Sequence, residues 1–219
     1  MKKLRILCLH GYHGSARILR SQMQSLVSGS ESVAEYIVID APSLTGGDFG
    51  WWHAVEQPFS AERGDPGVDR ATGYYKGWAR TREFLESVFA EQGPFDGVFG
   101  FSQGSALTGL LVGLRAPDGR VTQDKPLAFD FAVLVGGFVS NDPSHGELYS
   151  SAASFELPSL HIIGRSDFIV PNGVSRRLAA KFQKPTILEH AGGHVIASKP
   201  EIRAQYLEFL QEAARRRRA

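Results

Sequence analysis

A serine flanked by two glycines lies in the segment FDGVFGFSQGSALTGLL, residues 95–111. Gly100, Ser102 and Gly104 form a Gly-x-Ser-x-Gly motif, in which the serine can act as a nucleophile toward an acyl carbonyl. The chain holds 24 glycines among 219 residues, so about 0.2 matches to this motif are expected by chance. The motif alone is a weak indication, and the flanking sequence must decide whether Ser102 has a chemical role.

The flanks of Ser102 have the pattern that a nucleophile in this motif needs. An apolar, strand-like run over 95–101 ends at the serine, and a helix-like run over 103–114 follows it. Such a serine sits on a sharp, strained strand-to-helix turn, and the two glycines keep the neighbouring chain clear of it. Free N–H groups at a helix N-terminus favour negative charge. We therefore expect the backbone N–H of Gln103 to stabilise an oxyanion.

A second oxyanion donor is expected in the loop after the first apolar run. The sequence there is LHGYHGS, in which His10, Gly11 and Tyr12 follow the run directly. Gly11 allows a tight turn, and the backbone N–H of Tyr12 is the predicted donor. The alternative is that HGYHG only forms a turn before a helix.

A serine hydroxyl is a poor nucleophile unless a base activates it. The chain has seven histidines. We assign the base to His194, because HAGGHVI is a glycine-rich turn between the last apolar run and the final helical run. His190 is the alternative, but it is closer to the strand and is expected to point elsewhere. His161 lies inside an apolar run and is expected to be a core or edge residue.

The acid that orients the base is assigned to Asp167. It lies in IIGRSDFIVP, just after the fifth apolar run. The order Ser102, Asp167, His194 is the order found in α/β-hydrolases. Asp40 and Asp142 also follow strand-like runs. Asp40 comes before the serine, and Asp142 follows it by only one strand, which is earlier than usual.

The elements that must position these residues alternate along the chain. Alternating strands and helices predict an α/β fold with a mainly parallel sheet and helices on both faces. The strands are almost continuously apolar, as strands covered on both sides should be. We expect strands at 5–10, 35–40, 95–101, 129–137, 157–164 and 184–190, and helices at 15–28 (capped by Ser15), 73–92, 103–114, 173–183 and 200–215. The length fits a single domain over 1–219.

The segment 41–73 has no clean period and is rich in Gly, Pro and Asp. A loop this long in a compact domain is usually functional or mobile, so we interpret it as an irregular, lid-like segment. The aromatics of the next run have helical spacing, and we expect Tyr74 and Trp78 to pack in the core or under the lid.

Composition excludes several function classes. The chain has 24 Lys and Arg against 23 Asp and Glu, which does not suggest a nucleic acid or an anionic membrane as partner. The basic run Arg215–Arg218 is expected to belong to a flexible, solvated tail over 215–219. The scattered carboxylates lack the spacing of metal ligands, so no metal and no cofactor is expected.

The expected location is the cytoplasm. Cys8 is the only cysteine, so no internal disulfide can form, and its apolar surroundings predict a buried structural thiol. The N-terminal apolar run is too short for a signal peptide and indicates a strand. No apolar stretch is long enough to span a membrane.

Over nearly its whole length the chain resembles the FSH-type serine hydrolases, a branch of the α/β-hydrolases. The segments that carry the resemblance are LCLHGYHGS, GWW, FDGVFGFSQGSAL, VLVGGFVS, LPSLHIIGRSDFIVP and HAGGHVI. The acyl-protein thioesterase and carboxylesterase branch shares GFSQG and a Gly-x-x-Asp loop, but GWW and VGGFVS favour the FSH type. The resemblance implies an α/β-hydrolase fold, the triad Ser102, Asp167 and His194, and oxyanion donors at Tyr12 and Gln103.

The predicted activity is hydrolysis of a carboxylic ester or thioester through a serine acyl-enzyme. The acyl pocket should be apolar, with Trp51, Trp52 and Phe138 as possible lining residues; plain packing is the alternative for each. A medium or long acyl group is expected, and a thioester on a carrier protein is an alternative substrate. A non-catalytic binding module on a hydrolase fold is the alternative of another class.

Overall fold

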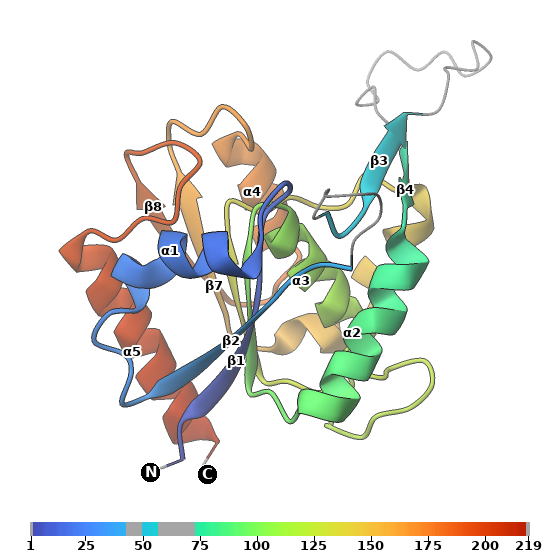
Figure 1. Cartoon of the computed structure of the whole chain (residues 1–219), viewed down its shortest axis with the longest axis horizontal. Coiled ribbons are helices and arrows are strands. Elements are labelled where there is room, and N and C mark those ends of the chain that lie inside the picture. The colour runs from blue at the N-terminus through green and yellow to red at the C-terminus, as the bar shows by residue number, and fades with distance from the viewer. Residues whose placement is uncertain (1, 43–49, 57–72, 218–219) are drawn as a thin grey trace.

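A six-stranded, all-parallel sheet forms the centre of the protein in a computed structural model that describes residues 2–42, 50–56 and 73–217 (Figure 1). The strands are arranged in the order β2-β1-β5-β6-β7-β8. Their bounds are β1 (Leu4–Leu9), β2 (Ala34–Ile39), β5 (Gly97–Phe101), β6 (Phe131–Val135), β7 (Ser159–Gly164) and β8 (Pro185–His190). Each of the six predicted strands is present, within three residues of its expected ends.

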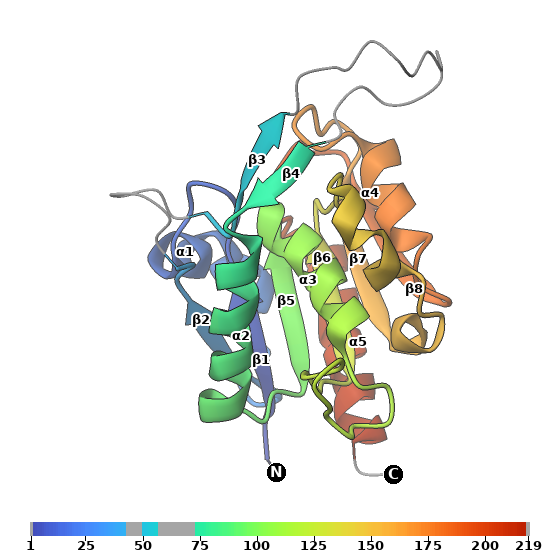
Figure 2. The same cartoon turned by 90° about the vertical axis from the view of Figure 1, so that its right-hand side faces the viewer.

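Helices cover both faces of the sheet, as the alternating pattern predicts. Helices α1 (Ala16–Val27) and α5 (Pro200–Arg216) pack on one face, against a buried cluster that includes Ile6, Phe99 and Ile162. The other face carries α2 (Trp78–Gln92), α3 (Gln103–Leu114) and α4 (Asn172–Ala179), as Figure 2 shows. Two short 3₁₀ helices, η1 (Pro143–Tyr149) and η2 (Ala153–Glu156), connect β6 to β7.

The helix ends follow local chemistry. Ser15 caps α1 as predicted, because its Oγ accepts a hydrogen bond from the Ile18 N–H at 3.2 Å. Helix α4 ends at Ala179 rather than near 183, because residues 180–183 form hydrogen-bonded turns and do not continue the helix.

The predicted helix at 73–92 is wrong at its start. Residues Gly73–Lys76 form β4, which pairs in an antiparallel ribbon with β3 (His53–Glu56). Gly77 has a φ of 96°, a left-handed conformation that separates β4 from α2. Because successive strand residues point to opposite sides, Tyr75 is buried and Tyr74 is 46% exposed, so the expected packing of Tyr74 is also wrong. Trp78 packs on the core as expected.

The end of α5 differs from the expected flexible tail. The helix continues through Arg216, and Arg215 and Arg216 both pair with Glu212. Arg217 donates to the Asp96 carboxylate at 3.0 Å and to the Lys3 carbonyl at 3.3 Å. These contacts anchor the described part of the basic run beside the N-terminal strand. Most of the lid-like segment expected over 41–73 lies outside the described residues.

The order of strands changes direction between β1 and β5. The chain adds β2 on one side of β1 and later adds β5 to β8 on the other side. At such a switch the loops after the two central strands diverge and leave a crevice at the carboxyl end of the sheet, where ligands bind in open α/β folds. The loop after β1 and Ser102 after β5 both lie at this point.

The turn at Ser102 is strained and closely packed. Ser102 has φ 55° and ψ −117°, a conformation that is costly for a residue with a side chain. Its N–H donates to the Val135 carbonyl at 2.9 Å, which holds the turn against β6. A Cβ added to Gly104 would collide with the Leu9 carbonyl oxygen of β1, and one added to Gly100 would collide with the Gly104 carbonyl. Only glycine therefore allows this approach of α3 to the sheet.

We expect Gly104→Ala to lower the free energy of unfolding by about 3 kcal/mol, because the new methyl group meets backbone of the central strand that cannot move aside. Gly173→Ala on α4 is the matched control: its added Cβ meets no atom within 4 Å, and its effect should stay within about 1 kcal/mol. Urea unfolding followed by tryptophan fluorescence measures both. Equal effects would contradict the close approach of α3 to β1.

Buried His161 should make stability depend on pH. Burial lowers the pKa of His161 to about 3, and its Nε2 lies 3.1 Å from the Ser159 hydroxyl. Between that value and the ordinary pKa of about 6.5 the unfolded chain binds one more proton than the folded chain, so stability is lost as pH falls. From pH 7.5 to 5.5 the free energy of unfolding should fall by about 1.4 kcal/mol more in the wild type than in His161→Gln. Parallel urea titrations would contradict this if both proteins lost the same amount.

Candidate active site

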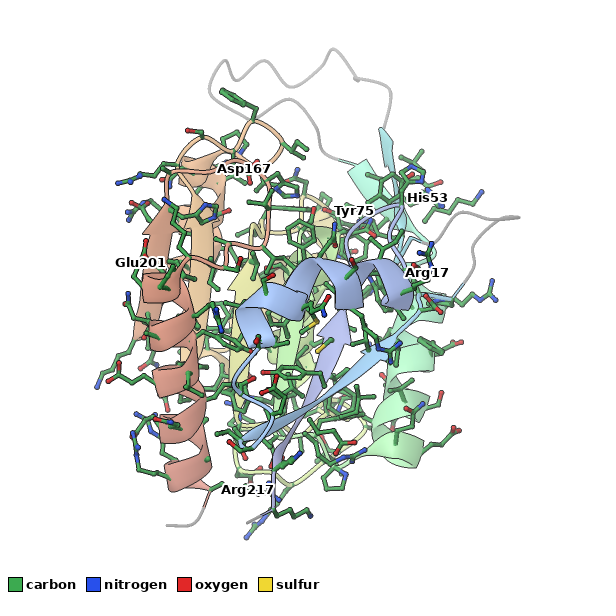
Figure 3. All side chains as sticks on the ribbon, turned by 60° about the vertical axis from the view of Figure 1, so that its left-hand side comes forward. Arg17, His53, Tyr75, Asp167, Glu201 and Arg217 are labelled. Atoms are coloured by element: carbon green, nitrogen blue, oxygen red, sulfur yellow. The ribbon has the colours of Figure 1, made fainter. Side chains whose placement is uncertain are left out.

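Three polar side chains from three separate loops meet at the carboxyl edge of the sheet. The Nε2 atom of His194 lies 2.8 Å from the Ser102 Oγ, and its Nδ1 atom lies 2.6 Å from the Asp167 Oδ2. The loops follow β5, β7 and β8, so the parallel sheet brings together residues that are far apart in sequence. Figure 3 shows Asp167 at the same end of the molecule as His53 and Tyr75, opposite Arg217.

The Asp167 carboxylate is held by its own loop. Its side chain is only 2% exposed, and its Oδ1 accepts hydrogen bonds from the N–H groups of Ile169 and Val170, at 2.9 and 2.8 Å. This leaves Oδ2 for His194. A carboxylate at Nδ1 fixes the proton on that nitrogen, so Nε2 is free to accept the Ser102 proton.

The His194 ring is held by packing as well. It lies against Phe101 of β5, with the ring centroids 5.0 Å apart and the planes tilted by 31°. The alternative base, His190, is turned away: its Nδ1 accepts the Gly192 N–H at 3.1 Å, and burial lowers its pKa. The structure therefore brings His194, and not His190, to Ser102.

The alternative acids have other partners. Asp40 accepts the Ala16 N–H at 2.7 Å at the start of α1. Asp142 begins η1 and accepts the N–H groups of Tyr75 and Ser144, at 2.7 and 2.9 Å. Both carboxylates satisfy backbone donors, so they act as structural caps.

The two expected oxyanion donors lie on either side of the switch between β1 and β5. Gln103 is the first residue of α3, and Tyr12 follows β1. The β1 loop touches the serine, because a Cβ added to Gly11 would lie 3.2 Å from the Ser102 Cβ. Within 2–42, 50–56 and 73–217, no acceptor pairs with the backbone N–H of Tyr12 or of Gln103. Both groups are therefore available to a negatively charged oxygen near Ser102.

A buried hydrogen-bond network that the sequence analysis missed ties these two donors together. The Gln103 side chain accepts the Trp51 N–H at 3.0 Å and donates to the Trp52 carbonyl at 2.9 Å. The Trp51 indole N–H donates to the His10 carbonyl at 2.8 Å. Trp51 thus connects the residue after Ser102 to the loop after β1. The only sign of this network in the sequence was the GWW motif, and that motif does not indicate which groups Trp51 binds.

His10 completes this network from inside the protein. Its Nδ1 lies 2.7 Å from the Gly11 carbonyl, and its Nε2 accepts the Ala41 N–H at 3.1 Å. Burial lowers the pKa of His10, so the ring is neutral and donates through Nδ1. It therefore fixes the first turn of the loop that carries Tyr12.

A cavity of about 1050 Å³ opens at Ser102. Its walls come mainly from the β1 loop, the β3–β4 ribbon, the loop after β6 and helix α4. The lining residues are Tyr12, Trp52, Ala54, Val55, Tyr75, Ser102, Gln103, Phe138, Val139, Asn141, Ile169, Val170, Pro171, Val174, Arg177, Ala180 and Lys181. Most of this surface is apolar, as the sequence analysis expects for an acyl site.

Two of the three predicted lining residues face the cavity. Phe138 lines it, and so does Trp52, which stacks on Tyr75 with ring centroids 4.6 Å apart. Trp51 does not, and that prediction is wrong. Its side chain is fully buried, and its indole N–H donates to the His10 carbonyl.

Three further expectations concern Cys8, metal ligands and membrane-spanning helices. Cys8 is buried in β1, and burial raises the pKa of its thiol. No group of three or more His, Cys, Asp or Glu within the described ranges could hold a metal ion. None of the helices described in the structure is long and apolar enough to cross a membrane.

We expect Gln103→Ala to lower the free energy of unfolding by about 2 to 4 kcal/mol, because it leaves the Trp51 N–H and the Trp52 carbonyl buried without partners. Gln24→Ala, at an exposed position of α1, is the control and should stay within about 0.5 kcal/mol. Urea unfolding tests this. A Gln103 variant as stable as its control would contradict a structural role for the network.

Known structures share the fold of this chain across almost its full length. SOBER1 of Arabidopsis thaliana superposes with a TM-score of 0.65 at 17% identity, covering 97% of this chain and 99% of that one. Acyl-protein thioesterase 2 of Zea mays gives a TM-score of 0.65 at 20% identity, covering 98% and 95%. The predicted α/β-hydrolase fold is confirmed.

Curated relatives and a family model agree on the type of protein. The esterase CG5412 of Drosophila melanogaster is 32% identical over 96% of this chain and 75% of its own length. The esterase OVCA2 of Xenopus tropicalis is 30% identical over 95% and 93%. The model described as "Serine hydrolase (FSH1)" matches residues 1–206, which confirms the resemblance and favours an enzyme over a non-catalytic binding module. The chain belongs to the FSH1 family of serine hydrolases.

Proposed function

We propose that this serine hydrolase cleaves carboxylic esters or thioesters of medium or long acyl groups, with Ser102 as nucleophile, His194 as base and Asp167 as the orienting acid. The observation that carries the proposal is the pair of short hydrogen bonds through His194, at 2.8 Å to Ser102 and 2.6 Å to Asp167. Such a chain of groups is the geometry by which a neutral hydroxyl becomes a nucleophile.

The reaction proceeds in two acyl-transfer steps. Ser102 Oγ attacks the carbonyl carbon while His194 Nε2 takes its proton, and Asp167 stabilises the resulting imidazolium. The oxyanion accepts hydrogen bonds from the backbone N–H groups of Tyr12 and Gln103. His194 gives its proton to the leaving alcohol or thiol, which leaves an acyl-enzyme on Ser102. A water molecule then attacks the acyl carbon while His194 takes its proton. The ester bond to Ser102 breaks, His194 returns the proton to Ser102 Oγ, and the acid is released.

The cavity supports the choice of acyl group. A volume of about 1050 Å³ is at the upper end of the usual range for small-molecule sites. Trp52, Val139 and Val174 present apolar surface in the same cavity as Ser102, which stabilises a hydrocarbon chain by about 0.8 kcal/mol for each buried methylene. A medium or long acyl chain fits this wall better than an acetyl group.

Thioesters belong to the same proposal. The Zea mays protein with the same fold is named an acyl-protein thioesterase, and a thioester needs the same nucleophile and oxyanion donors. A thioester on a carrier protein is the alternative substrate that the sequence suggests. It stays a prediction, as does the expected cytoplasmic location.

Substitutions in the triad should separate the three roles. With p-nitrophenyl octanoate as substrate, Ser102→Ala and His194→Ala should each lower kcat on the order of 10⁶-fold. Asp167→Asn should lower it less, on the order of 10⁴-fold, because the nucleophile and base remain but the imidazole tautomer is no longer fixed. Stopped assays with active-site titration of the wild type measure these rates.

Ser87→Ala, an exposed serine of α2, is the control and should keep the wild-type rate. Circular dichroism confirms that each variant is folded. Full activity in a folded Ser102→Ala or His194→Ala protein would contradict the proposed mechanism.

A further inference from the structure

The peptide group between Gly11 and Tyr12 has different surroundings at its two ends. Its carbonyl oxygen accepts the His10 Nδ1–H at 2.7 Å and the Gly14 N–H at 3.0 Å. Its N–H belongs to Tyr12 and has no acceptor among the residues that the structure describes. Because a trans peptide is planar, these two bonds direct the Tyr12 N–H away from His10. The interior of the protein therefore holds this group from the carbonyl end.

The Tyr12 side chain supplies a second attachment, to the β3–β4 ribbon. Its hydroxyl lies 3.1 Å from Nδ1 of His53, the first residue of β3, which is labelled in Figure 3. The hydroxyl can donate to Nδ1 or accept from Nδ1–H, so the bond forms in either tautomer of the imidazole. A Cβ added to Gly50 would lie 3.1 Å from Tyr12 Cε2, so the tyrosine ring also lies against the chain before β3.

Exposure alone does not require this contact. Tyr12 and Tyr74 are each 46% exposed, and Tyr74 belongs to β4 of the same ribbon. The Tyr74 hydroxyl has no hydrogen-bond partner within the described part of the chain. An exposed hydroxyl can bind water instead of a side chain. The bond from Tyr12 to His53 thus fixes the position of Tyr12 and does not serve to satisfy a buried group.

We infer that the Tyr12–His53 hydrogen bond holds the Tyr12 N–H in place for the oxyanion, which makes the Tyr12 side chain and His53 positioning residues of the reaction. This inference rests on the proposed function, since it concerns the same oxyanion site. The oxyanion forms only when Ser102 attacks, so a donor held in advance stabilises the transition state more than the bound ester. Loss of the bond should therefore lower kcat and leave KM almost unchanged.

Tyr12→Phe is the first test, because it removes the hydroxyl and keeps both the backbone N–H and the ring. With p-nitrophenyl octanoate, kcat should fall about three- to tenfold, the effect of one net hydrogen bond. Octyl trifluoromethyl ketone forms a tetrahedral adduct with an activated serine, and its inhibition constant should rise by the same factor. Tyr74→Phe is the matched control and should keep the wild-type kcat and inhibition constant.

Variants of His53 test whether the hydroxyl acts through the imidazole. His53→Phe should lower kcat as much as Tyr12→Phe does, and the double variant should lose no more than either single variant, because both remove the same bond. His53→Asn places an amide oxygen where Nδ1 lies, so it should restore most of the wild-type kcat. Circular dichroism and urea unfolding confirm that each variant is folded.

A folded Tyr12→Phe protein with the wild-type kcat and inhibition constant would overturn the inference, while hydrolysis that depends on Ser102 left the proposed function intact. Losses that add in the double variant, or a loss that His53→Phe does not share, would also overturn it, since the hydroxyl would then act on the substrate directly. A loss in His53→Asn as large as that in His53→Phe would do the same. Absence of any hydrolysis by a folded wild type would overturn both the inference and the proposed function.

Discussion

The approach of α3 to the central strands is the constraint on which the rest of the structure depends. Gly104 lets the first turn of α3 contact the Leu9 carbonyl of β1, and the Ser102 N–H binds the Val135 carbonyl of β6. These contacts hold the Ser102 backbone in its strained conformation at φ 55°. Strain of this kind costs on the order of 1–3 kcal/mol and persists only where surrounding contacts impose it. It lifts the hydroxyl above the sheet edge, where His194 can reach it.

Two further constraints build a site around Ser102. A parallel sheet delivers the loops after β5, β7 and β8 to one edge, so Asp167 and His194 meet Ser102 although they are 27 residues apart from each other and His194 is 92 residues from the serine. The network through Gln103 and Trp51 then joins α3 to the loop after β1. The network holds the segments that carry the backbone N–H groups of Tyr12 and Gln103, and neither of these N–H groups takes part in it.

Much of this could be predicted from the sequence, because the signals were local or depended on chain order. The Gly-x-Ser-x-Gly turn predicted the position of Ser102, and the order of the loops selected Asp167 over Asp142. His194 was preferred to His190 because it lies farther from the end of the strand, in the glycine-rich turn. The failures have physical causes. Tyr74, Tyr75 and Trp78 have a spacing that fits a helix, and only the left-handed Gly77 shows that a strand ends there. A tryptophan beside a site can support it or line it, and the direction of the Trp51 indole N–H depends on a partner 41 residues away.

The most direct test of the account is the intact mass of the protein after treatment with a fluorophosphonate. The reagent labels a serine only when a base and an oxyanion site activate it, so one adduct on the wild type and none on folded Ser102→Ala is the expected result. A folded wild type that gains no adduct, or a Ser102→Ala protein that is labelled equally, would contradict the central claim that Ser102 is the activated nucleophile.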